Sequence, residues 1–275
     1  MPKALAALPA LLVLASLGAS WILASEGQPQ FAYLGTMGAI LVIAVAAGAA
    51  RGRWDGALIN ARNLVSLAQF QALLWTIAVI GGFAAMVIAR MQEGLDDPLL
   101  VDIPTEVLGL CGIASGSLGL SKLVSARKRA REPSERDLHC AAAELGEDPE
   151  AIHESRRGTA YANSTLADAR WTDMFEGDEV GNAAHVEITK LQMFMLTVIA
   201  VIAYAVAVFR SLEAAEHDAL PAVSEGLAWI LGLSHAGYLA GKSADQSGST
   251  PALAAAPAPA EPEAAPSTVY APEGD

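Results

Sequence analysis

The sequence predicts an all-α fold, a polytopic bundle of transmembrane helices. The 275-residue chain is 53% hydrophobic and only 17% charged, with a mean hydropathy of +0.37, which is too apolar for an ordinary soluble protein. Its apolar residues gather into blocks of about twenty, the length at which a helix crosses the roughly 30 Å hydrocarbon core. The blocks lack the alternation of barrel strands, so helix is the form that satisfies their backbone in lipid.

Six such blocks follow one another along the chain: Ala4 to Ala24, Phe31 to Ala50, Leu67 to Ile88, Ile103 to Leu123, Ile188 to Phe209 and Leu220 to Leu239. The first follows a single basic residue, Lys3, which suits a signal anchor or a signal peptide. Its length favours an anchor, whereas the small residues Gly18 to Ser20 would allow cleavage before Trp21 and leave five helices.

Basic residues mark one side of the predicted bundle. If every block spans, Lys3, the Arg51 to Arg62 linker, the run Arg127 to Arg131 and Lys242 share one side. The connections on the other side contain acids but no Lys or Arg. Loops rich in Lys and Arg stay in the cytoplasm, so both termini are predicted to be cytoplasmic. The Ala-rich composition suggests a bacterial inner membrane.

The chain outside the blocks forms one long loop and one tail. The loop, residues 127–187, contains eight Arg or Lys and fourteen Asp or Glu, and is too short for an independent core. Helix formers predict a helix from Glu135 to Leu145 stopped by Gly146, and Pro149 starts a second. Helical spacing in Leu166 to Phe175 predicts a segment along the membrane surface or against the helix ends. The predicted segments are 1–24, 25–65, 66–126, 127–187, 188–243 and a disordered Ala/Pro-rich tail, 244–275.

An internal repeat relates the third and fourth blocks to the fifth and sixth. Phe70 to Ala84 aligns without gaps with Leu191 to Ala205, and the run from Gly112 to Lys122 resembles Gly232 to Lys242. Both copies enter from the same side, which predicts two parallel two-helix repeats related by an axis along the membrane normal. Chance similarity between apolar helices is the alternative.

Small residues recur four apart in the fourth and sixth blocks, at Gly112 and Gly116 and at Gly237 and Gly241. This spacing lets two helix backbones approach closely in lipid, so the four glycines are predicted to pack helices together. A ligand-facing or pore-facing groove is the alternative.

His235 is the one ionisable residue well inside a predicted span, and polar groups at such depth usually face a bundle interior, a partner or a water-filled cavity. It is the first candidate for a pore or ligand site, with Ser234 beside it. A neutral imidazole bonded to a neighbouring helix is the structural alternative. Glu106 and Glu225, near the opposite ends of their helices, are candidates for outer-mouth carboxylates.

Gln71 and Gln192 occupy matching places in the two repeats. We expect them to hydrogen-bond to each other across the pseudo-axis, and solute coordination is the second interpretation. Lys122 and Lys242 end their helices, where snorkelling to headgroups would account for them.

The loop has one aromatic and acidic segment. Its acids, Asp173 to Glu179, are predicted to form a solvated turn, because their spacing does not fit a calcium loop. Trp171 and Phe175 are predicted to stand exposed and to dock a cytoplasmic protein partner. Cys111 and Cys140 have neither metal-ligand nor disulfide spacing and are predicted to be free thiols.

The composition and motifs exclude several functions. A net charge of −13 disfavours nucleic-acid binding, and no catalytic, metal or cofactor motif occurs. The chain is therefore predicted to be a non-enzymatic, homo-oligomeric membrane protein without cofactors that passes an ion or small solute or gates its passage. The alternative is a membrane scaffold that presents its loop and tail to a protein partner.

Overall fold

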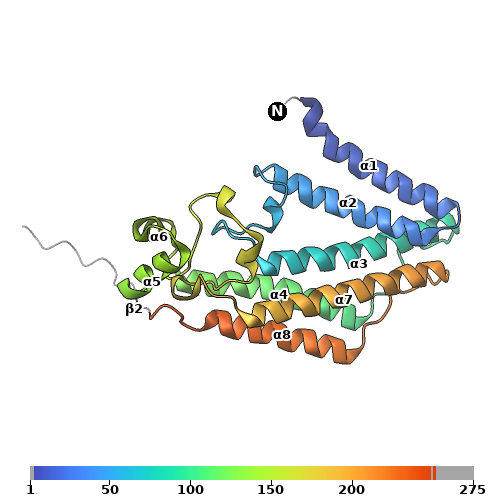
Figure 1. The fold of residues 1–275 in the computed structure, drawn as a ribbon. Coiled ribbons are helices and arrows are strands. Elements are labelled where there is room, and N and C mark those ends of the chain that lie inside the picture. Colours follow the sequence, from blue (N-terminus) through green and yellow to red (C-terminus); the bar gives the residue numbers. More distant parts are fainter. Residues whose placement is uncertain (1–2, 249, 252–275) are drawn as a thin grey trace, which may run out of the picture.

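The computed structural model describes residues 3–248 and 250–251 and is mainly helical (Figure 1). The elements in chain order are α1 (Lys3–Ser25), α2 (Pro29–Ala49), η1 (Gly56–Leu58), α3 (Leu67–Gln92), α4 (Thr105–Lys128), β1 (Arg131–Glu132), α5 (Glu135–Leu145), α6 (Pro149–Ser155), η2 (Leu166–Asp168), η3 (Trp171–Met174), η4 (Val180–Asn182), α7 (Ile188–Glu213), α8 (Glu225–Ser243) and β2 (Thr250–Pro251). Most of the predicted tail, residues 252–275, lies outside the described residues.

Five helices in the described part of the chain are long and apolar enough to cross a membrane: α1, α2, α3, α4 and α7. They are what a multi-pass membrane protein requires. The sixth predicted block forms α8, a helix of 19 residues at the expected place, but it is not among these five.

The long helices lie side by side (Figure 1). Helices α3, α4, α7 and α8 form a four-helix unit in which α3 packs on α4 and α7, and α8 packs on the same two. Helix α2 covers α3 and α7, and α1 lies outside α2. Helix α2 approaches α3 closely because residue 81 is a glycine, whose added Cβ would lie 3.1 Å from Met37 Cγ. The Tyr33 hydroxyl donates to the Ala78 carbonyl across this contact at 2.9 Å.

The long loop forms a cap over one end of the bundle, and we call residues 129–187 the cap. Helix α5 begins after Ser134, whose hydroxyl accepts from the Asp137 amide at 3.1 Å, and ends before Gly146 at φ +69°. Helix α6 starts at Pro149. Both short helices confirm the prediction. The small apolar core of the cap borrows Leu64 from the α2–α3 linker, so the cap is built onto the bundle.

The segment Leu166 to Phe175 packs against the helix ends, one of its two predicted placements, but its helical spacing does not produce a continuous helix. The segment forms two single turns, η2 and η3, with extended residues between them. The Asp168 carboxylate accepts from the Thr165 amide at 2.9 Å, and the Asp173 carboxylate accepts from the Arg170 amide at 2.9 Å. Aspartates that bond the backbone three residues earlier cap each turn and start it anew, which competes with a continuous helix.

The predicted packing role of Gly112, Gly116, Gly237 and Gly241 is wrong for contacts within this chain. A Cβ added at any of the four meets nothing within 4 Å. Helices α4 and α8 bury other faces, which include Ala114 and Ser117 on α4 and Leu231 on α8. The glycine faces therefore point out of the bundle.

Candidate functional site

A cluster of buried charges joins the cap to the bundle. Asp178 is 6% exposed and pairs with three buried cations. The Lys242 ammonium lies 3.0 Å from its carboxylate, the Lys190 ammonium lies 3.3 Å away, and Arg62 also pairs with it. Lys190 comes from the first turn of α7, Lys242 from the last turn of α8, and Arg62 from the linker before α3. One carboxylate thus ties three separate segments to the cap.

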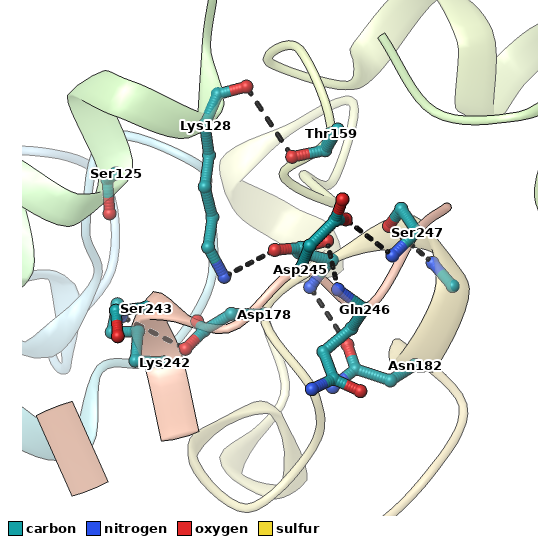
Figure 2. A network of polar contacts seen from close by, with 12 residues as sticks. Ser125, Lys128, Thr159, Asp178, Asn182, Lys242, Ser243, Asp245, Gln246 and Ser247 are labelled. Atoms are coloured by element: carbon teal, nitrogen blue, oxygen red, sulfur yellow. Dashed lines mark hydrogen bonds and ion pairs between the residues drawn. The ribbon is translucent and has the colours of Figure 1, made fainter. Parts of the chain in front are cut away.

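A second buried carboxylate, Glu179, links the cap to the end of α4 and to the chain after α8. The Lys128 ammonium lies 2.7 Å from one carboxylate oxygen, and the Gln246 amide donates to the other at 3.0 Å. Figure 2 shows Lys128 and Gln246 of this network, and there the Lys128 carbonyl also accepts from the Thr159 hydroxyl at 3.5 Å. The chain that follows α8 is therefore bonded to the cap through Glu179.

We call residues 244–248 the strap. The Ser247 side chain is fully buried and its hydroxyl accepts from the Gly181 amide at 3.0 Å, while its carbonyl accepts from the Ser134 amide at 3.2 Å. Residue 181 has to be glycine, because an added Cβ would lie 2.0 Å from the Gln246 carbonyl oxygen. The first residues of the predicted tail are therefore packed against the cap.

Two buried carboxylates in the cap have opposite pKa shifts. Burial alone would raise the pKa of Asp178, but Lys190, Lys242 and Arg62 outweigh it and hold that pKa well below its usual range. Burial raises the pKa of Asp173. Its two backbone hydrogen bonds and the exposed Arg170 lower this pKa, but by less than desolvation raises it. Asp178 therefore remains a permanent anion at neutral pH.

A cavity of about 540 Å³ adjoins this cluster, between the α2–α3 linker, the end of α4 and the cap. Six basic residues and two acidic residues line it: Arg51, Arg62, Lys122, Arg129, Lys190 and Lys242, with Asp173 and Asp178. The excess of four positive charges contrasts with the net charge of −13 of the whole chain. Positive charge is therefore concentrated here against the overall balance.

The six basic residues form an inner and an outer set. The inner set, Arg62, Lys190 and Lys242, is buried around Asp178. The outer set is exposed, and within the described residues none of its members has a carboxylate partner: Arg51, Lys122 and Arg129. Arg51 donates only to the Gly56 and Ile59 carbonyls, both at 2.8 Å. The outer set is therefore free to bind an added anion.

Neutral side chains complete the cavity wall. Ser66, Ser121 and Ser125 contribute hydroxyls, and the buried Gln69 Oε1 has no hydrogen-bond partner in the part of the chain that the structure describes. Leu67 and Leu118 add apolar surface from α3 and α4. The cavity can therefore hold a ligand with an anionic part and an apolar part.

The predicted pore residues lie apart from this cavity. His235 is 4% exposed, and its Nδ1 has no hydrogen-bond partner among the described residues, so the expected bond to a neighbouring helix is missing at this nitrogen. Ser234 and Gln192 meet in a separate hollow of about 320 Å³ on the outer side of α7 and α8. His235 lines neither of these two cavities.

The expected bond between Gln71 and Gln192 is wrong. The Gln71 amide donates to the Thr197 hydroxyl at 2.7 Å and to the Met193 carbonyl at 3.3 Å, whereas Gln192 is exposed. Residues 192 and 197 point about 140° apart on a helix, so only Thr197 faces α3. Gln71 still joins the two predicted repeats, but through another residue.

Glu106 and Glu225 lie in the first turns of α4 and α8, at the end of the bundle opposite the cap. Glu106 is half-buried, and Glu225 is exposed and accepts from the Trp229 indole at 3.2 Å. Both positions agree with the prediction of carboxylates near the helix ends.

The aromatic and acidic segment of the cap is less exposed than predicted. Phe175 is half-buried and packs edge-on against Phe194 with ring centroids 5.1 Å apart, so it is not a free docking residue. Trp171 is 42% exposed and stacks on Trp54 with centroids 6.1 Å apart.

The predictions for the acids and the helix-ending lysines need correction. Asp173, Asp178 and Glu179 are buried and do not form a solvated turn. Lys242 does not snorkel, because Asp178 holds it inside the protein, whereas Lys122 is exposed as expected. Both cysteines are free, with Cys140 exposed on α5 and Cys111 half-buried on α4.

The sequence analysis did not identify Arg62, Lys190 or Asp178 as site residues. Each of the two cations lies within a few residues of the start of an apolar block, which is also where ordinary interfacial residues occur. Comparison with protein-family models, curated proteins and solved structures finds no match. The site is therefore interpreted from its own chemistry.

Proposed function

We propose that this chain is a non-enzymatic integral membrane protein that binds an anionic, phosphate-bearing ligand in the basic cavity. The observation that carries the proposal is the lining of that cavity by six basic and two acidic residues in a chain of net charge −13. Guanidinium and ammonium groups are the side chains that proteins use for phosphate, through charge-assisted hydrogen bonds.

The outer set supplies the contacts in this proposal. Asp178 already compensates part of the inner charge, so an incoming anion gains most from Arg51, Lys122 and Arg129, which lack carboxylate partners among the described residues. The inner set contributes the field of its surplus positive charge. With the basic segments in the cytoplasm, the cavity opens on the cytoplasmic side.

Thermal unfolding of the purified protein in a neutral detergent tests this proposal. Inorganic pyrophosphate should raise the unfolding midpoint relative to sodium chloride of equal ionic strength, because a ligand that binds only the folded state stabilises it. The double variant Lys122→Gln, Arg129→Gln should lose this response. The matched variant Arg127→Gln, Arg136→Gln removes two exposed basic residues that do not line the cavity and should keep it. Equal responses in both variants, or no response in the wild type, would refute the proposal.

Passage of an ion or small solute through the four-helix unit is the second candidate function. Each of its four helices buries at least one polar side-chain atom without a hydrogen-bond partner in the described chain, among them Gln71 Oε1, Ser117 Oγ, Tyr204 hydroxyl and His235 Nδ1. Buried polar atoms usually have partners, so these four favour an interior that takes up a polar guest. His235→Ala should then change ion flux into liposomes containing the protein. Flux at the level of protein-free liposomes for the wild type would exclude this candidate.

The internal repeat and a homo-oligomer are further parts of this second proposed function. Helices α3 and α7 both have 26 residues and pack together, and the chain before α4 pairs in parallel with the chain before α8 at Asp102 and Ala219. These features support two parallel repeats. The outward glycine faces of α4 and α8 would let a second copy approach closely, which would build a route at an oligomer axis.

A further inference from the structure

We infer that the ligand of the basic cavity is the headgroup of an anionic phospholipid, held by its phosphate between Lys122 and Arg129. This inference rests on the proposed anion binding and specifies its source. Phosphate in solution is the other source of the same chemistry, and the experiment below separates the two.

The position of the cavity along α4 places it where headgroups lie. Its lining on α4 extends from Leu118 to Arg129, about 16 Å of helix. Helix α4 is one of the five helices that are long and apolar enough to cross a membrane, and the cavity begins at its last apolar turns and ends beyond its polar end. The polar zone of a bilayer leaflet occupies about 5–8 Å outside the hydrocarbon, so the cavity crosses the boundary between the two.

The side of α4 next to the cavity is open to lipid. Leu123 is 62% exposed and lies about 100° around the helix from Lys122, beside the exposed Ala126, which lines the cavity. Lys122 is itself exposed and lines the cavity. A lipid whose acyl chain lies against Leu123 can therefore bring its phosphate to the Lys122 ammonium without leaving its leaflet.

The lining suits a molecule that is anionic at one end and apolar at the other. Leu118 lies deepest on α4, while Lys122 and Arg129 lie one and three turns closer to the cap. This order of apolar and then basic groups matches the order of acyl chain and phosphate in a phospholipid. Basic pockets between transmembrane helices on the cytoplasmic side commonly take such headgroups.

An exposed aromatic pair marks the same level of the molecule. Trp54, 61% exposed, stacks on Trp171 beside the α2–α3 linker, whose residues 59–66 line much of the cavity. Tryptophan concentrates at the membrane–water interface, where its apolar ring and polar N–H are both accommodated. The pair therefore places the linker, and with it the cavity mouth, at the headgroup level.

Native mass spectrometry of the full chain tests the inference. The protein is presented with mixed micelles that contain equal amounts of phosphatidylglycerol and phosphatidylcholine, and the retained lipid is counted. We expect phosphatidylglycerol to be retained preferentially. The Lys122→Gln, Arg129→Gln variant should weaken this retention by about tenfold or more, since each basic residue near a membrane surface adds to the attraction for anionic lipid.

Two controls make the result specific. Lys122→Arg, Arg129→Lys keeps both charges and should keep the preference. Arg127→Gln, Arg136→Gln makes the same change in net charge away from the cavity and should also keep it. Should the double glutamine variant fail to fold, the single variants Lys122→Gln and Arg129→Gln take its place, each with a smaller loss.

The remaining outcomes overturn the inference in distinguishable ways. Phosphatidylglycerol retention that is equal in wild type and the glutamine variant would mean that the lipid binds elsewhere. Stabilisation by pyrophosphate that depends on Lys122 and Arg129, without preference for phosphatidylglycerol, would refute the lipid and leave the anion site in place. Absence of both effects would refute the anion site as well.

Discussion

Asp178 and Asp173 show how neighbouring groups set the pKa of a buried carboxylate. Each is 6% exposed, and they are five residues apart in the cap. Three buried cations surround Asp178, so its pKa falls despite desolvation. Asp173 accepts from the Val65 and Arg170 amides and pairs with no buried cation among the described residues, so desolvation raises its pKa. Burial alone therefore does not identify a charge that stabilises the fold.

Asp178→Asn should destabilise the cap far more than Asp173→Asn. The first removes the carboxylate that three buried cations share, of which Lys190 keeps a second partner in Glu187 at 3.7 Å, and this costs about 3–5 kcal/mol of unfolding free energy. The second keeps an acceptor oxygen for the two backbone amides and should cost less than about 1 kcal/mol. Thermal unfolding and limited proteolysis of residues 129–187 measure both. Similar losses in the two variants would contradict this account of the cluster.

The same two residues predict how stability depends on pH. A depressed pKa means that Asp178 stabilises the fold above its unfolded value of about 3.9, and that this contribution is lost only as pH falls through the lower folded pKa. Asp173 has a raised pKa, so its ionisation opposes folding as pH rises above its usual value. We expect the cap to resist proteolysis at pH 5 as well as at pH 7. A cap that opens as pH falls from 7 to 5 would show that Asp178 is not held ionised.

At the scale of elements, capping residues near the helix ends account for the cap helices. Contacts with residues distant in the chain account for the position of the strap. Helix α5 begins and ends, and helix α6 begins, at the predicted residues because Ser134, Gly146 and Pro149 act on their own backbone. The strap has no periodicity or cap signal of its own. It is ordered by bonds from distant residues, such as the Gly181 amide.

Gly181→Ala should release the strap. Its added Cβ would lie 2.0 Å from the Gln246 carbonyl oxygen, so backbone must move, at a cost of about 1–3 kcal/mol. Hydrogen exchange at the Gln246 and Ser247 amides should become faster. Gly237→Ala, where the added Cβ meets nothing within 4 Å, is the matched control and should leave this exchange unchanged. Unaltered exchange in Gly181→Ala would mean that the strap does not depend on this contact.

At the scale of the whole molecule, the orientation of the chain in the membrane decides from which side a ligand reaches the cavity. The basic residues that line it share one end of the bundle with the cap and the strap. If that end is cytoplasmic, as the distribution of Arg and Lys predicts, the cavity meets cytoplasmic-leaflet lipids. The two free cysteines allow this orientation to be measured without adding a tag.

A membrane-impermeant maleimide should label Cys140 in inverted vesicles and not in intact spheroplasts. Cys140 is exposed on α5 in the cap, whereas Cys111 is half-buried within a helix long and apolar enough to cross a membrane and should not react with this reagent. Cys140→Ser should therefore abolish labelling. Labelling of Cys140 from outside the cell would reverse the orientation and place the basic cavity in the other leaflet.

The sequence by itself determined the membrane character, the positions of the helices and the two cap helices, because apolar length and capping residues act over a few neighbouring positions. Tertiary structure alone decided which faces meet. Gln71 bonds Thr197 and not Gln192, and the glycines of α4 and α8 point outward, because the rotation of each helix depends on packing along its whole length.

The basic cavity shows the same division most clearly. Arg62, Lys190 and Lys242 are separated by many residues in the chain, and each alone resembles an ordinary residue at a helix end. Only the folded chain brings them to Asp178 and leaves Lys122 and Arg129 without a carboxylate among the described residues. Electrostatic energy depends on distances in space, and these distances are set only when the cap closes on the helix ends.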